Sequence, residues 1–461
     1  MWSALPSRNS EGCGGLVEGL VGVFGTQDTI FALATGAKKA AVALFRISGP
    51  EAANALARLA PAAEFPVRRA VLKTLWDPAS GLPIDLCLVT RFEAPASFTG
   101  EDVVEIGVTG GRAVISAMVS ALGGIDGLRV AEPGEFSWRA FTNGKMDLSA
   151  VEGLADLVDA ETEAQRNQAL RIAGGELRRE CEAIRSLLMD AMAEVEIGLD
   201  FSEVEGADEG ALEGSLRAVR AARVRIAGAL ANSSSAICRR DGFSVVIAGA
   251  PNVGKSTLMN AIARRDVAIT SPFAGTTRDT IETFLELRGY PVVFVDTAGI
   301  RPTEDPIERV GIDRARRRVE TADLVLWLAD APSSVEPLGT TVFQVRTKSD
   351  LAVPRSGISG KEFFVSGKTG AGVGELLEAI AEKAEDCMSN SEFAALPLER
   401  HRRAFEAALS ALEPIQPDRT LDLEMMAENL RDAVSAMEGV IGRVGVEDVL
   451  GHVFSRLCVG K

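Results

Sequence analysis

Histidine is scarce in this sequence, which contains only His401 and His452 among its 461 residues. Two histidines cannot supply a multi-histidine metal site, and they leave little room for a Ser-His-Asp or Cys-His nucleophile. Cysteines are few and scattered, and no C-x-x-C pair occurs among them. In a chain of this length, that pattern indicates reduced thiols in a cytoplasmic protein rather than a disulfide framework. The six cysteines are Cys13, Cys87, Cys181, Cys238, Cys387 and Cys458.

Long hydrophobic runs and a basic excess are also missing. No apolar run approaches the roughly 18 residues needed to cross a bilayer, so we expect no membrane partner. Residues 1–27 are Gly-rich, and their apolar stretch is interrupted by Glu18, so we interpret them as a loose N-terminal extension rather than a signal peptide. The net charge of −16 opposes generic coating of a polyanion.

The length of 461 residues suggests about three domains. Residues 28–145 mix short apolar runs with turns, which favours an α+β domain. Residues 146–240 and 386–461 have helical periodicity, whereas residues 241–385 alternate strand-like and helical segments, as in a parallel α/β sheet. Because both helical arrays have apolar stripes that need partners, we expect the α/β unit to be inserted into one helical bundle domain. Two separate bundles are the alternative.

A phosphate-binding loop is the clearest motif. An apolar strand, 244–248, runs into Gly-Ala-Pro-Asn-Val-Gly-Lys-Ser at 249–256, and a helix is expected to follow. In this G-x-x-x-x-G-K-S pattern, backbone N–H groups and the helix N-terminus face the β-phosphate. Lys255 neutralises the β/γ oxygens and the Ser256 hydroxyl coordinates Mg²⁺. The predicted contacts here are Asn252, Val253, Gly254, Lys255, Ser256 and Thr257.

Two later segments extend this site. Residues 274–279, Ala-Gly-Thr-Thr-Arg-Asp, offer hydroxyls where a switch loop must place one on Mg²⁺. A buried strand at 291–295 then ends in the D-x-x-G sequence Asp296, Thr297, Ala298 and Gly299. Asp296 can reach the metal through water, and the Gly299 N–H can meet the γ-phosphate.

Base choice is indicated by two further strand ends. One leads to Thr347, Lys348, Ser349 and Asp350, and the other to Ser366, Gly367 and Lys368. Asp350 can accept hydrogen bonds from the N1–H and the exocyclic amine of guanine, which adenine cannot donate, so the nucleotide is predicted to be GTP. Thr347 replaces the asparagine of the usual N-K-x-D. Because its hydroxyl retains part of the hydrogen bonding, we expect weaker nucleotide binding rather than an altered choice of base.

Hydrolysis must proceed without two familiar groups. Ile300 stands where Ras-like proteins keep a water-orienting glutamine, so acidic residues downstream, Glu304, Asp305 and Glu308, are the candidates for that role. An arginine finger could be replaced by K⁺ held on the side-chain oxygen of Asn252. From spacing alone, an Asn252 that merely satisfies the loop backbone is an equally good interpretation.

Five motifs outside the α/β unit complete the pattern: Arg-Ile-Ser-Gly at 46–49, Ser-Phe-Thr-Gly-Glu-Asp-Val-Val-Glu at 97–105, Pro-Gly-Glu-Phe at 133–136, residues 139–148, and Cys-Val-Gly-Lys at 458–461. With the internal GTPase they resemble the MnmE (TrmE) family of tRNA-modification GTPases, within the TrmE-Era-EngA-YihA-Septin-like superfamily. The resemblance covers nearly everything from Asp28 to Lys461.

The resemblance implies a multidomain protein with an α+β N-terminal domain that dimerises and binds 5-formyl- or methylene-tetrahydrofolate, a helical domain made of two segments, and an inserted Ras-like G domain. It implies a K⁺-activated GTPase that works with the flavoprotein MnmG (GidA) as a hetero-tetramer. Together these would install a 5-carboxymethylaminomethyl-type group on the wobble uridine of certain tRNAs. The RNA contact would be shared with the partner and confined to basic stretches such as 217–225 or Arg239-Arg240.

Site residues follow from the same resemblance. Arg46 and Lys145 suit the glutamate carboxylates of a folate and Glu105 suits its pterin donors, with Lys461 nearby. Glu308 would orient the attacking water, beside Lys255 as the other catalytic residue. K⁺ would be held by Asn252, Ser271, Phe273 and Thr276, and Mg²⁺ by Ser256 and Thr277. The loop that contacts the nucleotide would comprise Ser271, Pro272, Phe273, Ala274, Gly275, Thr276 and Thr277.

Two other functions remain open from the sequence. One is a ribosome-assembly GTPase whose flanking domains bind RNA, although such a clamp has no need of a Cys-x-Gly-Lys ending. The other is a folate-binding scaffold whose G domain only binds nucleotide. Against an inactive site stand the intact Lys255, Ser256, Thr277 and Asp296. For Cys458 we favour a small buried residue over a nucleophile.

Overall fold

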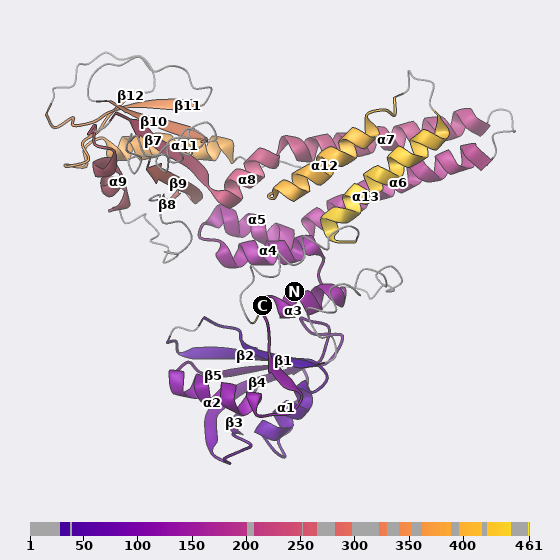
Figure 1. Cartoon of the computed structure of the whole chain (residues 1–461), viewed down its shortest axis with the longest axis vertical. Coiled ribbons are helices and arrows are strands. Elements are labelled where there is room, and N and C mark those ends of the chain that lie inside the picture. The colour runs from indigo at the N-terminus through magenta and orange to yellow at the C-terminus, as the bar shows by residue number, and fades with distance from the viewer. Residues whose placement is uncertain are drawn as a thin grey trace, which may run out of the picture. The chain divides into compact units, whose positions relative to one another are not determined.

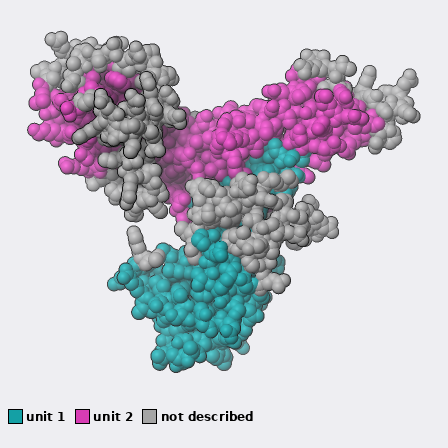
Figure 2. All heavy atoms as spheres, in the orientation of Figure 1, with its two compact units in different colours: residues 1–155, 434–461 teal, residues 156–433 magenta. Residues whose placement is uncertain are grey.

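The computed structural model describes residues 28–36, 39–200, 207–250, 252–264, 282–296, 322–329, 341–351, 362–388, 396–416, 422–443 and 460, with the backbone alone at 200, 207–211, 282 and 296. The chain divides into two compact units, residues 1–155 with 434–461 and residues 156–433 (Figure 2). The predicted five-part division is finer than these units and stays a prediction.

The first unit contains a six-stranded sheet (Figure 1). Its strands are β1 (Thr29–Leu33), β2 (Val42–Ser48), β3 (Val71–Trp76), β4 (Pro83–Phe92), β5 (Val103–Thr109) and β6 (Leu128–Val130), in the order β3-β4-β5-β2-β1-β6. Three helices accompany it: α1 (Ala52–Leu59), α2 (Arg112–Gly123) and α3 (Glu135–Thr142). The α+β prediction for this region is confirmed.

The two faces of this sheet differ in what covers them. Phe45, Cys87, Val89 and Ile106 point into a core that is completed by α1 and α2. Residues one step along the strands point the other way, and several are apolar yet exposed. We call them the apolar patch: Val42 at 60 % exposure, Leu72 at 58 %, Leu86 at 58 % and Leu88 at 51 %.

Helices dominate residues 148–241 and 399–441. They are α4 (Leu148–Asp159), α5 (Glu163–Ala173), α6 (Glu176–Asp200), α7 (Ala207–Ala231), α8 (Ser233–Asp241), α12 (Glu399–Leu412) and α13 (Leu423–Ile441). On α6, Leu177, Cys181, Ile184 and Leu188 are buried at helical spacing, as the periodicity predicted. Helices α6 and α7 lie side by side, and α12 packs against α7 (Figure 1). Within the described ranges, no helix has both the length and the apolar character to cross a membrane.

The α/β unit of residues 243–387 has its own six-stranded sheet. Its elements are β7 (Phe243–Gly249), α9 (Lys255–Ala263), β8 (Glu282–Leu287), β9 (Tyr290–Asp296), β10 (Leu324–Ala329), β11 (Thr341–Arg346), β12 (Glu362–Phe364) and α11 (Val373–Cys387). The strand order is β12-β11-β10-β7-β9-β8, and every neighbouring pair is parallel except β8 with β9. The predicted parallel sheet is confirmed.

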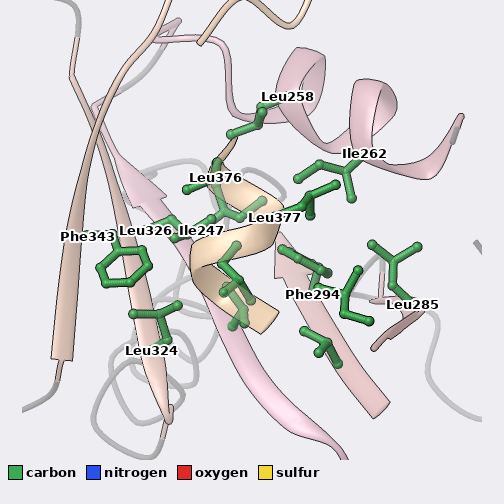
Figure 3. Packing of buried hydrophobic residues seen from close by; sticks show 14 of the residues in the cluster. Ile247, Leu258, Ile262, Leu285, Phe294, Leu324, Leu326, Phe343, Leu376 and Leu377 are labelled. Atoms are coloured by element: carbon green, nitrogen blue, oxygen red, sulfur yellow. The ribbon is translucent and has the colours of Figure 1, made fainter. Parts of the chain in front are cut away.

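Figure 3 shows the core of this unit. Leu258 and Ile262 from α9 and Leu376 and Leu377 from α11 pack on the inward side chains of the central strands, such as Ile247. Strand β7 lies in the middle of the sheet, so its carboxyl end opens where parallel sheets bind ligands.

Candidate functional site

The loop after β7 has the backbone that phosphate binding requires. Gly249 has φ +143°, and a Cβ added there would stand 2.3 Å from the carbonyl oxygen of Leu328 on the neighbouring strand. Gly254 has φ +100° and is the N-cap of α9. Both positions therefore need glycine, because any larger residue would be strained or would clash.

Lys255 is held across this loop. Its Nζ donates hydrogen bonds to the carbonyl oxygens of Gly249 at 2.8 Å and Ala250 at 2.9 Å. The ammonium group and the N-terminus of α9 thus present positive charge to the same space, which suits a phosphate group. Asn252 is exposed in this loop and has φ +61°, a left-handed conformation that asparagine tolerates better than most residues.

The two predicted guanine motifs meet in the structure. The Ser366 hydroxyl donates a 2.7 Å hydrogen bond to Oδ1 of Asp350. This bond, helped by the nearby charge of Lys368, lowers the pKa of Asp350, so the carboxylate needed to accept from guanine is favoured. The Ser349 N–H donates to the carbonyl of Val365, which fixes one motif on the other.

Thr347 connects the guanine motifs to the phosphate loop. Its hydroxyl donates to the backbone carbonyl of Val253 at 2.5 Å. An asparagine side chain is longer than threonine, and here the shorter residue still reaches the loop. The prediction that Thr347 keeps part of the hydrogen bonding is therefore confirmed, whereas its effect on affinity stays a prediction.

Steric crowding explains why position 367 is a glycine. A Cβ at this position would stand 2.9 Å from both the carbonyl carbon and the carbonyl oxygen of Thr257, and 3.0 Å from the backbone nitrogen of Leu258. These are backbone atoms of α9, which cannot move aside cheaply. Glycine lets the second guanine motif approach the helix that follows the phosphate loop.

A second constellation lies on the sheet of the first unit. Arg46 on β2 is directly opposite Glu105 on β5. Its Nε and Nη2 donate to Oε1 of Glu105 at 3.0 and 2.8 Å, while Nη1 donates to the carbonyl of Gly460 at 3.4 Å. The guanidinium also lies 4.8 Å from the ring centroid of Phe98. The residue before Lys461 thus contacts Arg46, whereas the predicted place of Lys461 near the folate residues stays a prediction.

Comparisons with known proteins match both the N-terminal region and the rest of the chain to one family. Residues 29–145 match the family model of the GTP-binding protein TrmE N-terminus, and residues 148–458 match that of the MnmE helical domain. The tRNA modification GTPase MnmE of Methylobacterium sp. (strain 4-46) is 49 % identical over 440 residues, covering 94 % of this chain and 100 % of the relative. The chain belongs to the MnmE family.

Other members are similarly close. The tRNA modification GTPase MnmE of Rhodopseudomonas palustris (strain ATCC BAA-98 / CGA009) is 46 % identical, covering 95 % of this chain and 99 % of that protein. Among solved structures, the G domain of the T. maritima FeoB iron transporter is 26 % identical and covers 31 % of this chain and 98 % of that one, with a TM-score of 0.23.

In this MnmE chain, one expectation about the folate residues needs correction. The resemblance gave Arg46 the glutamate end of a folate and Glu105 the pterin end. These ends lie at opposite extremes of the ligand, whereas the two side chains are hydrogen-bonded to each other. The pair can only serve one end together. Lys145 is half-buried, and its side-chain carbons lie against Gly100 in the 97–102 loop, which also carries Phe98.

Several residues of the MnmE motifs form an ionic network that the sequence did not reveal. Arg139 donates to Asp28 at 2.8 Å, to Glu135 at 3.0 Å and to Glu101 at 3.2 Å. The side chains of Arg139 and Glu135 are 5 % and 0 % exposed. Arg129 also contacts Asp28 and Glu135. The spacing of Glu135 and Arg139, four residues apart on α3, was the available signal, and it indicates structure rather than ligand binding.

The prediction that Arg239 and Arg240 form an RNA contact is wrong. Arg239 is 7 % exposed and donates to the Met388 carbonyl and to Gln168. Arg240 pairs with Asp156 at 2.9 Å. Both guanidinium groups hold elements of the second unit together.

Other predicted site residues lie outside the described residues: Ser271, Pro272, Phe273, Ala274, Gly275, Thr276, Thr277, Thr297, Ala298, Gly299, Glu308 and Lys461. Their roles stay predictions. The backbone of Asp296 is described and pairs in register with Ile247, two residues before Gly249. That register places Asp296 at the same sheet edge as the phosphate loop, as expected.

Proposed function

We propose that this chain is a K⁺-dependent GTP hydrolase that acts with a flavoprotein partner in 5-carboxymethylaminomethyl-type modification of the wobble uridine of certain tRNAs. The observation that carries this is an intact phosphate loop in a chain 49 % identical, over 94 % of its length, to a protein named tRNA modification GTPase MnmE. Close similarity over the whole chain favours a shared activity rather than a shared domain alone.

Phosphate binding follows from the loop geometry. The N–H groups around Gly254 and the N-terminus of α9 would hold the β-phosphate. Lys255 would give up its hydrogen bonds to two loop carbonyls and donate instead to the β- and γ-phosphate oxygens. Asp350 would accept hydrogen bonds from guanine. Ser256 and Thr277 would hold Mg²⁺, which supplies charge neutralisation to the phosphates when bound. Glu308 would orient the attacking water by accepting a hydrogen bond from it.

A monovalent cation would replace the arginine finger. Asn252 is suited to ligate it because its left-handed backbone and exposed side chain leave the amide oxygen at the loop surface. Ser271, Phe273 and Thr276 would supply further ligands. K⁺ at this position supplies positive charge to the developing transition state when bound.

The salt dependence of hydrolysis tests this. Steady-state GTP hydrolysis is measured in KCl and in NaCl at equal ionic strength, for the wild type and for Asn252→Ala. We expect KCl to accelerate the wild type at least tenfold, about 1.4 kcal/mol of barrier, and to have little effect on Asn252→Ala. Asn260→Ala, an exposed asparagine on α9, is the matched control and should respond like the wild type. Equal rates in both salts would rule out K⁺ activation.

Dimerisation is supported by the apolar patch. Leu72 lies directly opposite Leu88, and Thr74 opposite Leu86, so the exposed side chains form one continuous surface. An exposed apolar sheet face of this kind indicates a protein contact. We propose a second copy of this chain as the occupant, in line with the family resemblance. Arg46 and Glu105 lie on the same face, one row of side chains farther along the strands.

The folate proposal keeps Arg46, Glu105, Lys145 and Lys461 as the binding set, with 5-formyl- or methylene-tetrahydrofolate as the ligand. Arg46 would position the Glu105 carboxylate, and that carboxylate would accept hydrogen bonds from donors at one end of the folate.

Insertion of the G domain into one helical domain is supported by the packing of α12 against α7. Helix α7 precedes the α/β unit in the chain and α12 follows it, so helices from both flanks belong to one bundle.

The partner and the RNA complete the proposal. The MnmG-type flavoprotein would join two copies of this chain in a hetero-tetramer, and the cytoplasm is the expected compartment. For RNA, the 217–225 stretch on α7 remains, since Arg220 and Arg223 form no ion pair within the described ranges. Deleting the gene and analysing both the tRNA nucleosides and the ribosomal subunits separates this function from the ribosome-assembly alternative. Loss of the wobble modification with normal subunits is expected, and the reverse result would favour the alternative.

A further inference from the structure

Two cysteines and a carboxylate converge at the base of the α/β unit, away from the phosphate loop residues. Cys238 lies on α8, Asp323 directly precedes β10, and Cys387 is the last residue of α11. Their ligand atoms, one from each residue, all lie within 4.8 Å of one another. The Sγ of Cys238 is 4.0 Å from Oδ2 of Asp323. We infer that Cys238, Asp323 and Cys387 together bind one thiophilic divalent cation, such as Zn²⁺.

The cluster is held in place by bonds that do not depend on an ion. Asp323 is fixed to the start of β7, because its Oδ2 accepts from the Ser244 N–H at 2.8 Å and its N–H donates to the Ser244 carbonyl at 3.1 Å. The end of α11 is fixed to α8, because Nε of Arg239 donates to the Met388 carbonyl at 2.9 Å. A preformed ligand set loses little conformational freedom when the metal binds.

The donor types suit zinc. Thiolate and carboxylate ligands bind Zn²⁺ at about 2.3 Å and 2.0–2.2 Å, so tetrahedral neighbours stand about 3.5–3.8 Å apart. The three ligand atoms lie within 4.8 Å of one another, so side-chain movements of about 1 Å would bring them to the spacing that an ion requires. Cys238 is buried and Cys387 half-buried, whereas Asp323 is exposed and gives the site an open side. A water molecule can complete the coordination there.

Charge balance also favours a divalent ion. Binding displaces the two thiol protons to solvent, which leaves two thiolates and a carboxylate around the metal. Their three negative charges are offset by the ion and by the buried guanidinium of Arg239, whose field acts on both thiols.

The position of the cluster in the chain suggests a structural role for the ion. Helix α8 runs directly into β7, and α11 is the last helix of the α/β unit (Figure 1). Cys238 and Cys387 therefore bracket this unit in the chain, and an ion bound to both fastens its entry to its exit. Asp323 adds the start of β10. The ion is structural, and the nucleotide residues are not among its ligands.

Metal binding to the full chain tests the inference. The background is Cys13→Ser/Cys458→Ser, which keeps the cysteines named in this cluster together with Cys87 and Cys181. Reduced, metal-stripped protein is titrated with Co²⁺, and Zn²⁺ retention is measured after dialysis. We expect one ion per chain and a thiolate-to-cobalt charge-transfer band. Cys181→Ser, a buried cysteine on α6, is the matched control and should keep both.

Cys387→Ser should abolish the band and weaken Zn²⁺ binding by more than the roughly 10- to 100-fold that losing an outer-shell partner costs. Asp323→Asn guards against a folding artefact, because its amide oxygen can still accept from Ser244; it should keep GTP hydrolysis while losing Zn²⁺ affinity. Binding that is unchanged in Cys387→Ser would overturn the inference. So would absence of a retained ion, or a Cys238–Cys387 disulfide in protein whose thiols were alkylated during lysis.

Discussion

The hydroxyl of Thr347 donates a hydrogen bond to the backbone carbonyl of Val253, so the strand end predicted to read the base is joined to the loop predicted to hold the phosphates. Val253 is 3 % exposed, and its carbonyl therefore depends on a protein donor. This contact lets a threonine stand where related GTPases carry asparagine. This bond is therefore one physical connection between the predicted guanine motif and the phosphate loop.

Removing that hydroxyl should weaken nucleotide binding. Thr347→Val keeps the shape of the side chain but leaves the Val253 carbonyl without this donor, at a cost of about 1–2 kcal/mol. We expect the Kd for GDP to rise about 5- to 30-fold, measured by titration with a fluorescent analogue. Thr347→Ser retains the hydroxyl and should bind within about twofold of the wild type. Equal Kd values for the valine and serine variants would contradict this role.

Gly367 gives a second prediction at the same site. Gly367→Ala would place a Cβ 2.9 Å from the Thr257 carbonyl, and α9 or the guanine motif must shift to relieve the contact. Overpacking of this kind costs about 1–3 kcal/mol. We expect lower GTP affinity and a lower melting temperature. Gly111→Ala is the control, since nothing lies within 4 Å of a Cβ there. A Gly367→Ala protein as stable and as tightly binding as the control would refute the steric explanation.

The contrast between Asp350 and Arg139 shows what a sequence can predict here. Asp350 and Ser366 each follow a strand of the same parallel sheet, and the carboxyl ends of such strands lie at one edge. The proximity of Asp350 to Ser366 could therefore be predicted. The limits of this strand could also be predicted, because an apolar run ends at the phosphate loop: the segment expected at 244–248 is β7, Phe243–Gly249.

The partners of Arg139 could not be predicted, because Asp28, Glu101 and Glu135 meet only after the N-terminal strand, a loop and α3 have packed. The Arg46–Glu105 pair shows the same limit: both residues were named, but their mutual hydrogen bonds depend on the cross-strand register of β2 and β5.

The Arg139 network should control the stability of the first unit. Arg139→Met leaves the fully buried Glu135 without one of its two arginine partners, a change that costs about 3–5 kcal/mol for a buried pair. Urea unfolding followed by tryptophan fluorescence measures it. Arg166→Met, which breaks an exposed pair with Glu163, should cost less than about 1 kcal/mol. A similar shift in both variants would contradict a special role for the network.

Acid should weaken the same network. Burial alone would raise the pKa of Asp28, but hydrogen bonds from Arg129 and Arg139 outweigh it and hold this pKa below 3.8. A carboxylate with a lowered pKa stabilises the fold above its unfolded pKa of about 3.9, and that contribution is lost as the pH falls through the folded value. The wild type should therefore keep this contribution down to about pH 4. Arg139→Met removes part of this pKa shift, so as the pH falls below about 4 it should lose less stability than the wild type loses, measured by urea unfolding across a pH series.

The apolar patch predicts how the chain associates. If a second copy covers it, the wild type should have twice the chain mass of 48.7 kDa by light scattering. Leu88→Asp puts a carboxylate at the centre of the patch, opposite Leu72, and burying two such charges without partners costs several kcal/mol, enough to give monomers. Val130→Asp, at 56 % exposure on β6, is the matched control and should remain dimeric. Nucleotide binding should be unchanged in both, since neither residue belongs to the α/β sheet. A monomeric wild type, or a Leu88→Asp protein that dimerises as well as the control, would show that another surface or partner accounts for the exposed leucines.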